Sequence, residues 1–276
     1  MVPMAYGGEG ADTLGYVAAL AEVAYACAAT AVVMSVHNSI VCESILRFGT
    51  EDQKQKYLKP LASGRRIGAF ALTEPHAGSD PVSQSTTAVR DKTTYIINGS
   101  KRFTTTGKNS GLVIVTAKTD EGQRHKGISA FVVDKGTPGF KVGHTEDKMG
   151  LKASDTTDLI FDNCRVPAAN LLGEEGQGFK IAMTALDGGR IGIAARPTPW
   201  KASPTLAGTA ERTSRCSSST TSTRPRKACC VAATNCRARF TRMSLSTTYK
   251  GEPHSFQASR KTPRLRTKER TKAASS

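Results

Sequence analysis

The sequence lacks a run of apolar residues long enough to cross a membrane, and it lacks a secretion signal at its start. A membrane-spanning helix needs about 20 consecutive apolar residues, and a signal peptide needs a basic segment followed by an apolar one. The first residues, MVPMAYGGEGAD, contain neither pattern. We therefore expect no membrane span, and no leader is visible.

Cysteines spaced as in a disulfide framework or a zinc site are also missing. Cys27, Cys42 and Cys164 lie far apart in apolar or strand-like surroundings, and scattered thiols of this kind are typical of a reducing compartment. The other four cysteines have neither C-x2-C spacing nor a neighbouring histidine, so we predict no metal site. They are Cys216, Cys229, Cys230 and Cys236.

Acidic residues are scarce only in the last part of the chain. The formal net charge is +16, from 39 basic and 23 acidic residues. Residues 196–276 hold 18 of the basic and 3 of the acidic residues, which leaves 21 and 20 in residues 1–195. The first part is therefore nearly neutral and does not indicate a nucleic-acid-binding domain. The basic part would bind polyanions weakly at low salt, and no specific nucleic-acid partner is expected.

The basic segment also lacks a helical or strand period. Residues 196–276 contain 26 serines and threonines and few large aliphatic residues. Such a segment cannot bury enough apolar surface to offset the entropy lost on ordering. We predict a disordered basic tail.

Residues 1–66 instead show apolar residues at helical spacing. One helix is predicted over about residues 12–28, with Asp12 or Thr13 as its N-cap, and a second over about 30–48. The sequence TEDQ that follows has the form of a capping box, which predicts a short helix over about 50–61.

From residue 67 the pattern changes to that of short strands. Asn98-Gly99 is expected to form a hairpin turn between two of them. Short strands at this spacing favour a compact antiparallel barrel or sandwich. The predicted strands are 67–73, 86–90, 94–97, 101–105, 112–118, 128–133, 140–144 and 158–161.

The predicted fold class is α+β, in four parts. Residues 1–66 form a partial N-terminal helical domain, and residues 67–175 form the central β domain. Helical spacing from Phe179 marks residues 176–195 as the start of a C-terminal helical domain, and the disordered basic tail is 196–276.

The first predicted strand ends in the sequence ALTEPHAGSD, residues 71–80. The apolar run stops at Thr73, Glu74 and Pro75 and gives way to small residues. Proline ends a strand because it has no N–H to donate, and a glycine lets a chain pass close to a ligand. This stretch therefore ends a strand and begins a loop of small residues at the edge of the β domain.

The same stretch resembles the first signature of the acyl-CoA dehydrogenase family, and further matches follow in that family's order. The resemblance covers residues 1–195, and the helix around residues 35–39 most resembles short-chain, butyryl-CoA dehydrogenase-like members. It implies helices, a small β domain and further helices. The other matching stretches are 99–107, 149–156, 161–167 and 176–191.

The resemblance implies FAD as cofactor. In the family the strand ending at Thr73 presents its hydroxyl and backbone to the flavin's pyrimidine edge, which needs hydrogen bonds in fixed geometry. Phe103 resembles an aromatic that packs on the isoalloxazine ring, and Thr105 resembles the threonine that hydrogen-bonds N5, the hydride acceptor. The residues assigned to the flavin are Phe70, Ala71, Leu72, Thr73, Glu74, Pro75, His76, Ala77, Gly78, Ser79, Phe103, Thr104 and Thr105.

A site for the CoA part of a substrate is implied as well. Ser79 resembles a position that contacts CoA. The segment Asp187-Gly188-Gly189-Arg190 resembles another, with Arg190 as a cationic partner and the glycines allowing close approach. A helix kink with a solvated Arg190 is the structural alternative.

The implied reaction is oxidation of a short-chain acyl-CoA to a trans-2-enoyl-CoA with hydride transfer to FAD N5. The family removes the α-proton with a Glu late in its C-terminal helical domain. The superficial counterpart here, Glu252, is out of order and precedes a proline, so no catalytic residue is assigned. We expect impaired catalysis and hypothesise a chain truncated at both ends, with a change of reading frame near Arg196.

Two other functions stay open. One is a non-catalytic remnant or FAD- or CoA-binding fragment, and the other is a polyanion binder that uses the basic tail. Besides acyl-CoA as substrate, the resemblance implies electron transfer flavoprotein as partner and a homo-oligomer in the family. The implied compartment is the mitochondrial matrix in a eukaryote and the cytoplasm in a bacterium.

Overall fold

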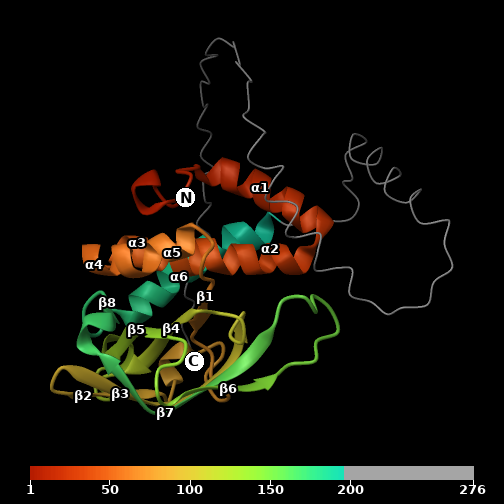
Figure 1. Ribbon diagram of the computed structural model, residues 1–276. Coiled ribbons are helices and arrows are strands. Elements are labelled where there is room, and N and C mark those ends of the chain that lie inside the picture. Colours follow the sequence, from red (N-terminus) through yellow and green to blue (C-terminus); the bar gives the residue numbers. More distant parts are fainter. Residues whose placement is uncertain (196–276) are drawn as a thin grey trace, which may run out of the picture. The chain divides into compact units, whose positions relative to one another are not determined.

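The computed structural model describes residues 1–195, in which helices precede a β-sheet and the long helix α6 (Gly178–Ala194) follows it. Figure 1 shows the N-terminal helices stacked over the sheet, with α6 (teal) running from the sheet side near β8 (Leu171–Leu172) to the side of α2 (Ala28–Ser35). The predicted α+β class, with a helical N-terminal part and a central sheet, is confirmed. The predicted tail, the change of reading frame and Glu252 lie outside the described residues.

The first two predicted helices are present. After a 3-10 turn, η1 (Met4–Tyr6), helix α1 spans Thr13–Ala26. Its N-cap is Asp12, whose carboxylate accepts a hydrogen bond from the N–H of Gly15 at 2.7 Å. A carboxylate at this position satisfies an otherwise unpaired donor of the first turn.

The second helix is continuous but irregular in its middle. It runs through α2 (Ala28–Ser35), the π-helical η2 (Val36–Cys42) and α3 (Glu43–Phe48). The Ser39 hydroxyl donates to the carbonyl of Ser35 at 2.6 Å, and a serine bonded back to the preceding turn competes with the regular ladder.

The capping box is confirmed at the next helix, which comprises α4 (Glu51–Gln53), η3 (Lys54–Leu58) and α5 (Lys59–Ala62). The Gln53 N–H donates to the Thr50 hydroxyl, and the Thr50 N–H donates to the Gln53 side chain, both at 3.2 Å. The helix start is thus fixed by local sequence alone.

Eight strands form one sheet in the order β6-β7-β3-β2-β4-β5-β8, and β1 pairs with β4. Most neighbours are antiparallel, but β1 and β2 each run parallel to β4, so the sheet is mixed rather than antiparallel throughout. The strands are β1 (Gly68–Ala71), β2 (Thr87–Asp91), β3 (Thr94–Thr105), β4 (Leu112–Lys118), β5 (Ile128–Asp134), β6 (Phe140–Thr145), β7 (Thr156–Pro167) and β8 (Leu171–Leu172).

The predicted hairpin turn at Asn98-Gly99 is wrong, because both residues lie inside the long strand β3. Gly99 has φ +145°, and a Cβ there would lie 2.5 Å from the Thr86 hydroxyl. The glycine thus permits a bulge and a close approach between strands. The turn between β2 and β3 lies instead at Lys92, where φ is +54°.

The strands β4 and β5 are buried on both faces. On one face Val113 and Val115 pack with Phe131 and the residues of β3 and β7. On the other, Leu112 and Ile114 pack against the helices. Because both faces are covered, these two strands read as continuous apolar runs rather than as alternating ones.

The helix over residues 28–48 is 21 residues long and apolar enough, by length and composition, to cross a membrane. In the structure its residues Val41, Cys42 and Ile45 are fully buried among the sheet and the other helices. We therefore interpret it as a core helix, and the absence of a membrane span stays a prediction.

Candidate functional site

The sequence after β1 forms a tight loop closed by its own backbone. Glu74 and Ala77 exchange two hydrogen bonds, N–H to carbonyl, at 3.0 and 3.2 Å. Ala77 is buried, while Pro75 and His76 at the tip are exposed. The proline and the small residues thus shape a turn rather than a continuation of the strand.

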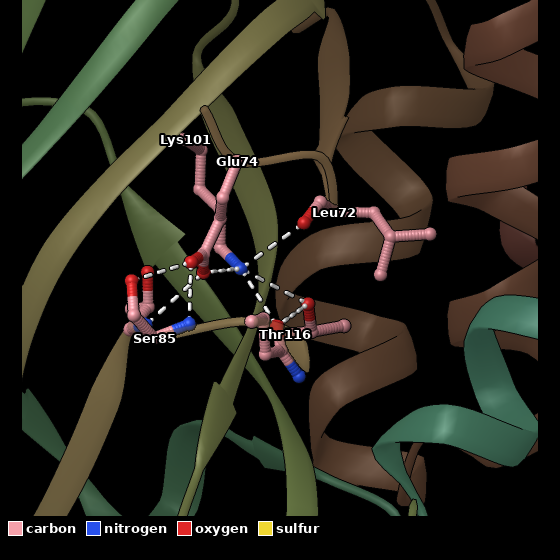
Figure 2. A network of polar contacts seen from close by, with 7 residues as sticks. Leu72, Glu74, Ser85, Lys101 and Thr116 are labelled. Atoms are coloured by element: carbon pink, nitrogen blue, oxygen red, sulfur yellow. Dashed lines mark hydrogen bonds and ion pairs between the residues drawn. The ribbon is translucent and has the colours of Figure 1, made fainter. Parts of the chain in front are cut away.

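A buried ion pair holds this loop to the sheet. The Lys101 ammonium lies 2.7 Å from Glu74 Oε1, and the two side chains are 0% and 2% exposed. Nζ of Lys101 also donates to the Leu72 carbonyl at 3.2 Å and to Gln84 Oε1 at 2.8 Å. Figure 2 shows the two side chains meeting, with the Leu72 carbonyl and Thr116 beside them.

The Glu74 carboxylate is fully occupied by donors of the protein. Besides Lys101, it accepts hydrogen bonds from the N–H of Ser85 at 2.5 Å, the hydroxyl of Ser85 at 2.8 Å and the N–H of Thr86 at 3.1 Å. Its side chain therefore holds segment 84–86 to the loop, and it has no free oxygen that faces a ligand.

The pKa values of both side chains of this pair are strongly shifted. Burial alone would raise the pKa of Glu74, but the charge and hydrogen bond of Lys101, aided by Thr86 and Ser85, lower that pKa to about 2. Burial lowers the pKa of Lys101 to about 8, against the opposing effect of Glu74. Glu74 is consequently ionised throughout the neutral range.

Two of the predicted cofactor-binding stretches are brought together here. The N–H of Arg102 donates to the Thr73 carbonyl at 2.7 Å. The preceding residue, Lys101, holds the Leu72 carbonyl. The end of β1 is thus fixed to β3, only a few residues before Phe103 and Thr105.

The second stretch carries backbone strain. Phe103 has φ +54° and Thr106 has φ +65°, values that side chains other than glycine seldom adopt. The register of β3 against β7 shifts between Lys101 and Thr104, and a bulge of this kind re-aims a side chain. The Phe103 ring is consequently 54% exposed. Strain of this type concentrates at functional sites.

The remaining residues predicted to bind flavin differ in how deeply they are buried. Ala71, Ala77 and Thr104 are buried, and Phe70 is half-buried against the helical core. Any ligand contact from Ala71, Ala77 or Thr104 would therefore have to come from the backbone. Thr73 and Thr105 are half-buried residues, and their hydroxyls make no hydrogen bond within residues 1–195.

The loop leaves unused groups at its surface. Gly78 and Ser79 are exposed and take part in no hydrogen bond with the described residues. A Cβ added to Gly78 would meet no atom within 4 Å. The protein itself therefore does not require a glycine there, and the free N–H groups are available to an anionic or carbonyl ligand.

The predicted CoA segment lies within helix α6. Asp187 and Arg190 form an exposed ion pair at 2.5 Å on α6. A Cβ on Gly188 would lie 3.1 Å from the Ser39 carbonyl, and one on Gly189 would lie 3.1 Å from Ile40. These glycines permit close helix–helix packing, and α6 is one continuous helix through this segment. The contact of the segment with CoA stays a prediction.

The two groups of predicted residues do not share one cavity in this structure. Asp187 and Gly188 line a hollow of about 580 Å³ between α1, α3 and α6, together with Tyr16 and Glu43. No residue of loop 72–79 lines that hollow. Ser79 belongs to the loop, and Arg190 projects from α6.

Sequence reasoning missed Lys101, Gln84 and Thr116. The signal for Lys101 was present, because a lysine inside a strand at an inward-facing position needs a buried partner. The partner, Glu74, lies in loop 72–79, and the sequence assigned it to the cofactor rather than to an ion pair. Neither residue's role is visible until the fold places β3 beside the end of β1.

Comparison with known proteins agrees with this arrangement. The N-terminal domain of acyl-CoA dehydrogenases matches residues 1–65, and the middle domain of acyl-CoA dehydrogenases matches residues 69–164. An acyl-CoA dehydrogenase of Bacillus subtilis is 54% identical over 195 residues, which are 71% of this chain and 52% of that protein.

Solved structures show the same likeness. Butyryl-CoA dehydrogenase from Megasphaera elsdenii is 49% identical with a TM-score of 0.69, over 70% of this chain and 51% of that one. A chain in the structure of the electron transferring flavoprotein of Acidaminococcus fermentans is 53% identical with the same TM-score, over 70% and 51%. This chain thus spans about half the length of each of these proteins. It belongs to the acyl-CoA dehydrogenase family, of which it carries the N-terminal and middle domains.

Proposed function

We propose that this chain binds FAD through loop 72–79 and the stretch 103–105 and that it derives from a short-chain acyl-CoA dehydrogenase. The observation that carries the proposal is the junction of the two stretches, where Arg102 N–H holds the Thr73 carbonyl at 2.7 Å. This junction places the exposed ring of Phe103, whose backbone is strained, beside loop 72–79, whose N–H groups at Gly78 and Ser79 are unused.

The residues present fit a flavin. The hydroxyls of Thr73 and Thr105 are free to donate to ring nitrogens and oxygens, and Phe103 offers an apolar surface to a flat ring. The open space at Gly78 leaves room for a ligand close to the backbone. When bound, FAD supplies a hydride acceptor for dehydrogenation of an acyl thioester.

Removal of the α-proton needs a base, and the proposed site supplies none of suitable strength. Its buried carboxylate, Glu74, is held by Lys101, and a pKa of about 2 makes it a poor proton acceptor. Asp80 lies at the end of the same loop and accepts hydrogen bonds from Ser83 and Val82, which lower its pKa. We infer that residues 1–195 bind the cofactor without completing the reaction.

The experiment is expression of the full chain with added FAD, followed by absorption spectroscopy and addition of butyryl-CoA. A yellow protein that is not bleached by butyryl-CoA agrees with cofactor binding without dehydrogenation. Bleaching would show a dehydrogenase that finds its base in residues outside those described. A soluble and colourless protein would contradict FAD binding altogether.

The partners and the compartment belong to the same proposal. An acyl-CoA is the proposed ligand, and electron transfer flavoprotein is the proposed acceptor for a reduced flavin. Homo-oligomer formation is checked by sedimentation of the full chain with and without FAD. The mitochondrial matrix or the bacterial cytoplasm is the proposed location, depending on the source.

A further inference from the structure

The buried pair Lys101–Glu74 is the strongest polar feature of the sheet that the proposed chemistry does not use. We propose that Lys101 is a positioning residue, which with Glu74 sets the spacing between loop 72–79 and the stretch 102–105 so that one cofactor meets both. This inference rests on the proposed function. It concerns how the site is held and not which atoms contact the ligand.

The hydrogen bonds of Lys101 join segments that are distant in sequence. Its ammonium has three protons and four acceptors within reach. Two acceptors are in the loop, the Leu72 carbonyl at 3.2 Å and Glu74 Oε1 at 2.7 Å. The others are Gln84 Oε1 at 2.8 Å and the Thr116 hydroxyl at 3.4 Å, which lies on β4.

Glu74 extends the network in the opposite direction. Its carboxylate accepts from the backbone of Ser85 and of Thr86, which lead into β2. The loop is thereby bound on one side to β3 and on the other to the start of β2. Figure 2 shows these contacts converging on the facing ends of the two side chains.

The pair is poorly suited to stabilising the fold alone. Taking two charges out of water carries a large desolvation cost before their attraction is counted, and well-packed apolar residues often replace such a pair without loss of stability. Apolar residues cannot supply directional hydrogen bonds, which fix the position of the groups that they join. The hydrogen bonds of Lys101 fix the Leu72 carbonyl immediately before Thr73, while the main chain fixes Lys101 two residues before Phe103.

The test compares Lys101→Met with the double variant Glu74→Gln/Lys101→Met, because the double variant leaves no unpaired buried charge. The matched control is Arg66→Met, which removes a cation at the opposite end of β1, where Arg66 donates to Asp134 and to the Gly111 carbonyl at 2.5 Å each. FAD affinity, the absorption spectrum of bound FAD and the thermal midpoint are measured for each protein.

We expect both Lys101 variants to bind FAD about tenfold more weakly or worse, as on removal of an outer partner of a bound group, with a shifted flavin spectrum. The control is expected to lower the thermal midpoint while affinity and spectrum stay unchanged. A purely structural role of Lys101 would give the control's pattern. Unchanged affinity and spectrum in both Lys101 variants would overturn the inference and leave FAD binding standing.

If the unmodified chain does not bind FAD, the proposed function fails, and amide hydrogen exchange without cofactor decides the inference separately. Faster exchange in residues 72–79 and 102–105 of Lys101→Met, with β4 and β5 unchanged, would support a positioning role. Equal exchange in those residues would refute it. If neither Lys101 variant folds while the control does, the pair is a requirement of the fold and the inference is rejected.

Discussion

At the residue scale, Glu74 shows how one side chain of a binding loop can act entirely inside the protein. It stands between Thr73 and Pro75, in the stretch that resembles a flavin signature, yet its oxygens and its N–H are all bonded within the chain. Its carboxylate therefore shapes the loop, and the ligand contacts of this loop stay a prediction.

Because the pKa of Glu74 falls from its ordinary 4.5 to about 2 on folding, its charged form stabilises the fold above pH 4.5. That contribution, on the order of 3 kcal/mol, is lost as the pH falls towards 2. Glu74→Gln removes this dependence, so its stability should change less between pH 4.5 and 2, measured by urea unfolding at each pH. At pH 7 the variant should be less stable by about 3–5 kcal/mol, because Lys101 is left buried without its counter-charge.

The control for Glu74 is Glu121→Gln. Glu121 is exposed and makes no ion pair with the described residues. Its replacement should therefore leave the pH dependence of stability the same as in the unmodified protein. Parallel stability curves for Glu74→Gln and the unmodified protein would show that the buried pair is not formed.

Gly78 offers a second prediction at this scale. Its backbone is not in the left-handed region, and a Cβ there would meet open space. Gly78→Ala should therefore leave the thermal midpoint unchanged but weaken FAD binding by about tenfold, or about 1.4 kcal/mol, because the methyl group enters the space reserved for the ligand. Gly150→Ala, where a Cβ also meets nothing within 4 Å, should change neither quantity. Equal FAD affinity in both variants would place the ligand elsewhere.

At the scale of elements, α6 packs closely against the helix of residues 28–48, and small residues lie at the contact. Gly192 is buried, and a Cβ there would lie 2.2 Å from the Ser35 hydroxyl and 3.3 Å from the Tyr16 hydroxyl. Ser35 is itself buried. The glycines of α6 thus set how closely two helices approach, which is a packing role in a segment that sequence resemblance assigned to ligand binding.

Gly192→Ala should destabilise the protein by about 1–3 kcal/mol, the usual cost of overpacking, despite the better helix propensity of alanine. Gly15→Ala is the contrast, since Gly15 is exposed in the first turn of α1. Its added Cβ would lie 3.2 Å from the Asp12 carboxylate and 3.9 Å from the Ala11 side chain. That variant should be neutral or more stable by up to about 1 kcal/mol. Thermal unfolding of both variants measures the difference, and a stabilised Gly192→Ala would contradict the close packing.

At the scale of the whole described part, one core joins the helices to the sheet. Ile45, Leu58 and Leu61 from the helices pack with Leu112 and Ile114 of β4 and with Val132 of β5. The shared cluster contains fully buried residues from both parts. When either part unfolds, the other therefore loses the apolar cover on the face that carries this cluster. The two parts should therefore unfold together.

Ile114→Ala should lower the stability by about 2–5 kcal/mol, the usual range for such a core truncation. Amide exchange should accelerate equally in α3 and in β5, because the cavity lies between them. Val89→Ala on β2, where the side chain is 62% exposed, should change stability by less than about 0.5 kcal/mol. Separate unfolding of helices and sheet in Ile114→Ala would show two independent cores.

The sequence alone determined the elements whose signals are local. Asp12 and the Thr50–Gln53 box specify helix starts, because the bonds they make lie within four residues. The apolar runs of β4 and β5, and the order of the motifs, were equally readable. The irregular turns of η2 and the strain at Phe103 were not, because each depends on neighbours that are brought close by folding.

Only the tertiary structure decided which side chains hold the segments of the candidate site together. The sequence placed Thr73, Glu74 and Phe103 in two motifs, but it could not show that Lys101 reaches Glu74, since 26 residues separate them along the chain. Nor could it show that Asn98-Gly99 forms a bulge, because a two-residue turn signal is overridden when the strand continues to pair with β7. Local capping and periodicity act over a few residues and are written in the sequence, whereas buried charge pairs and strand register are fixed by contacts between distant segments.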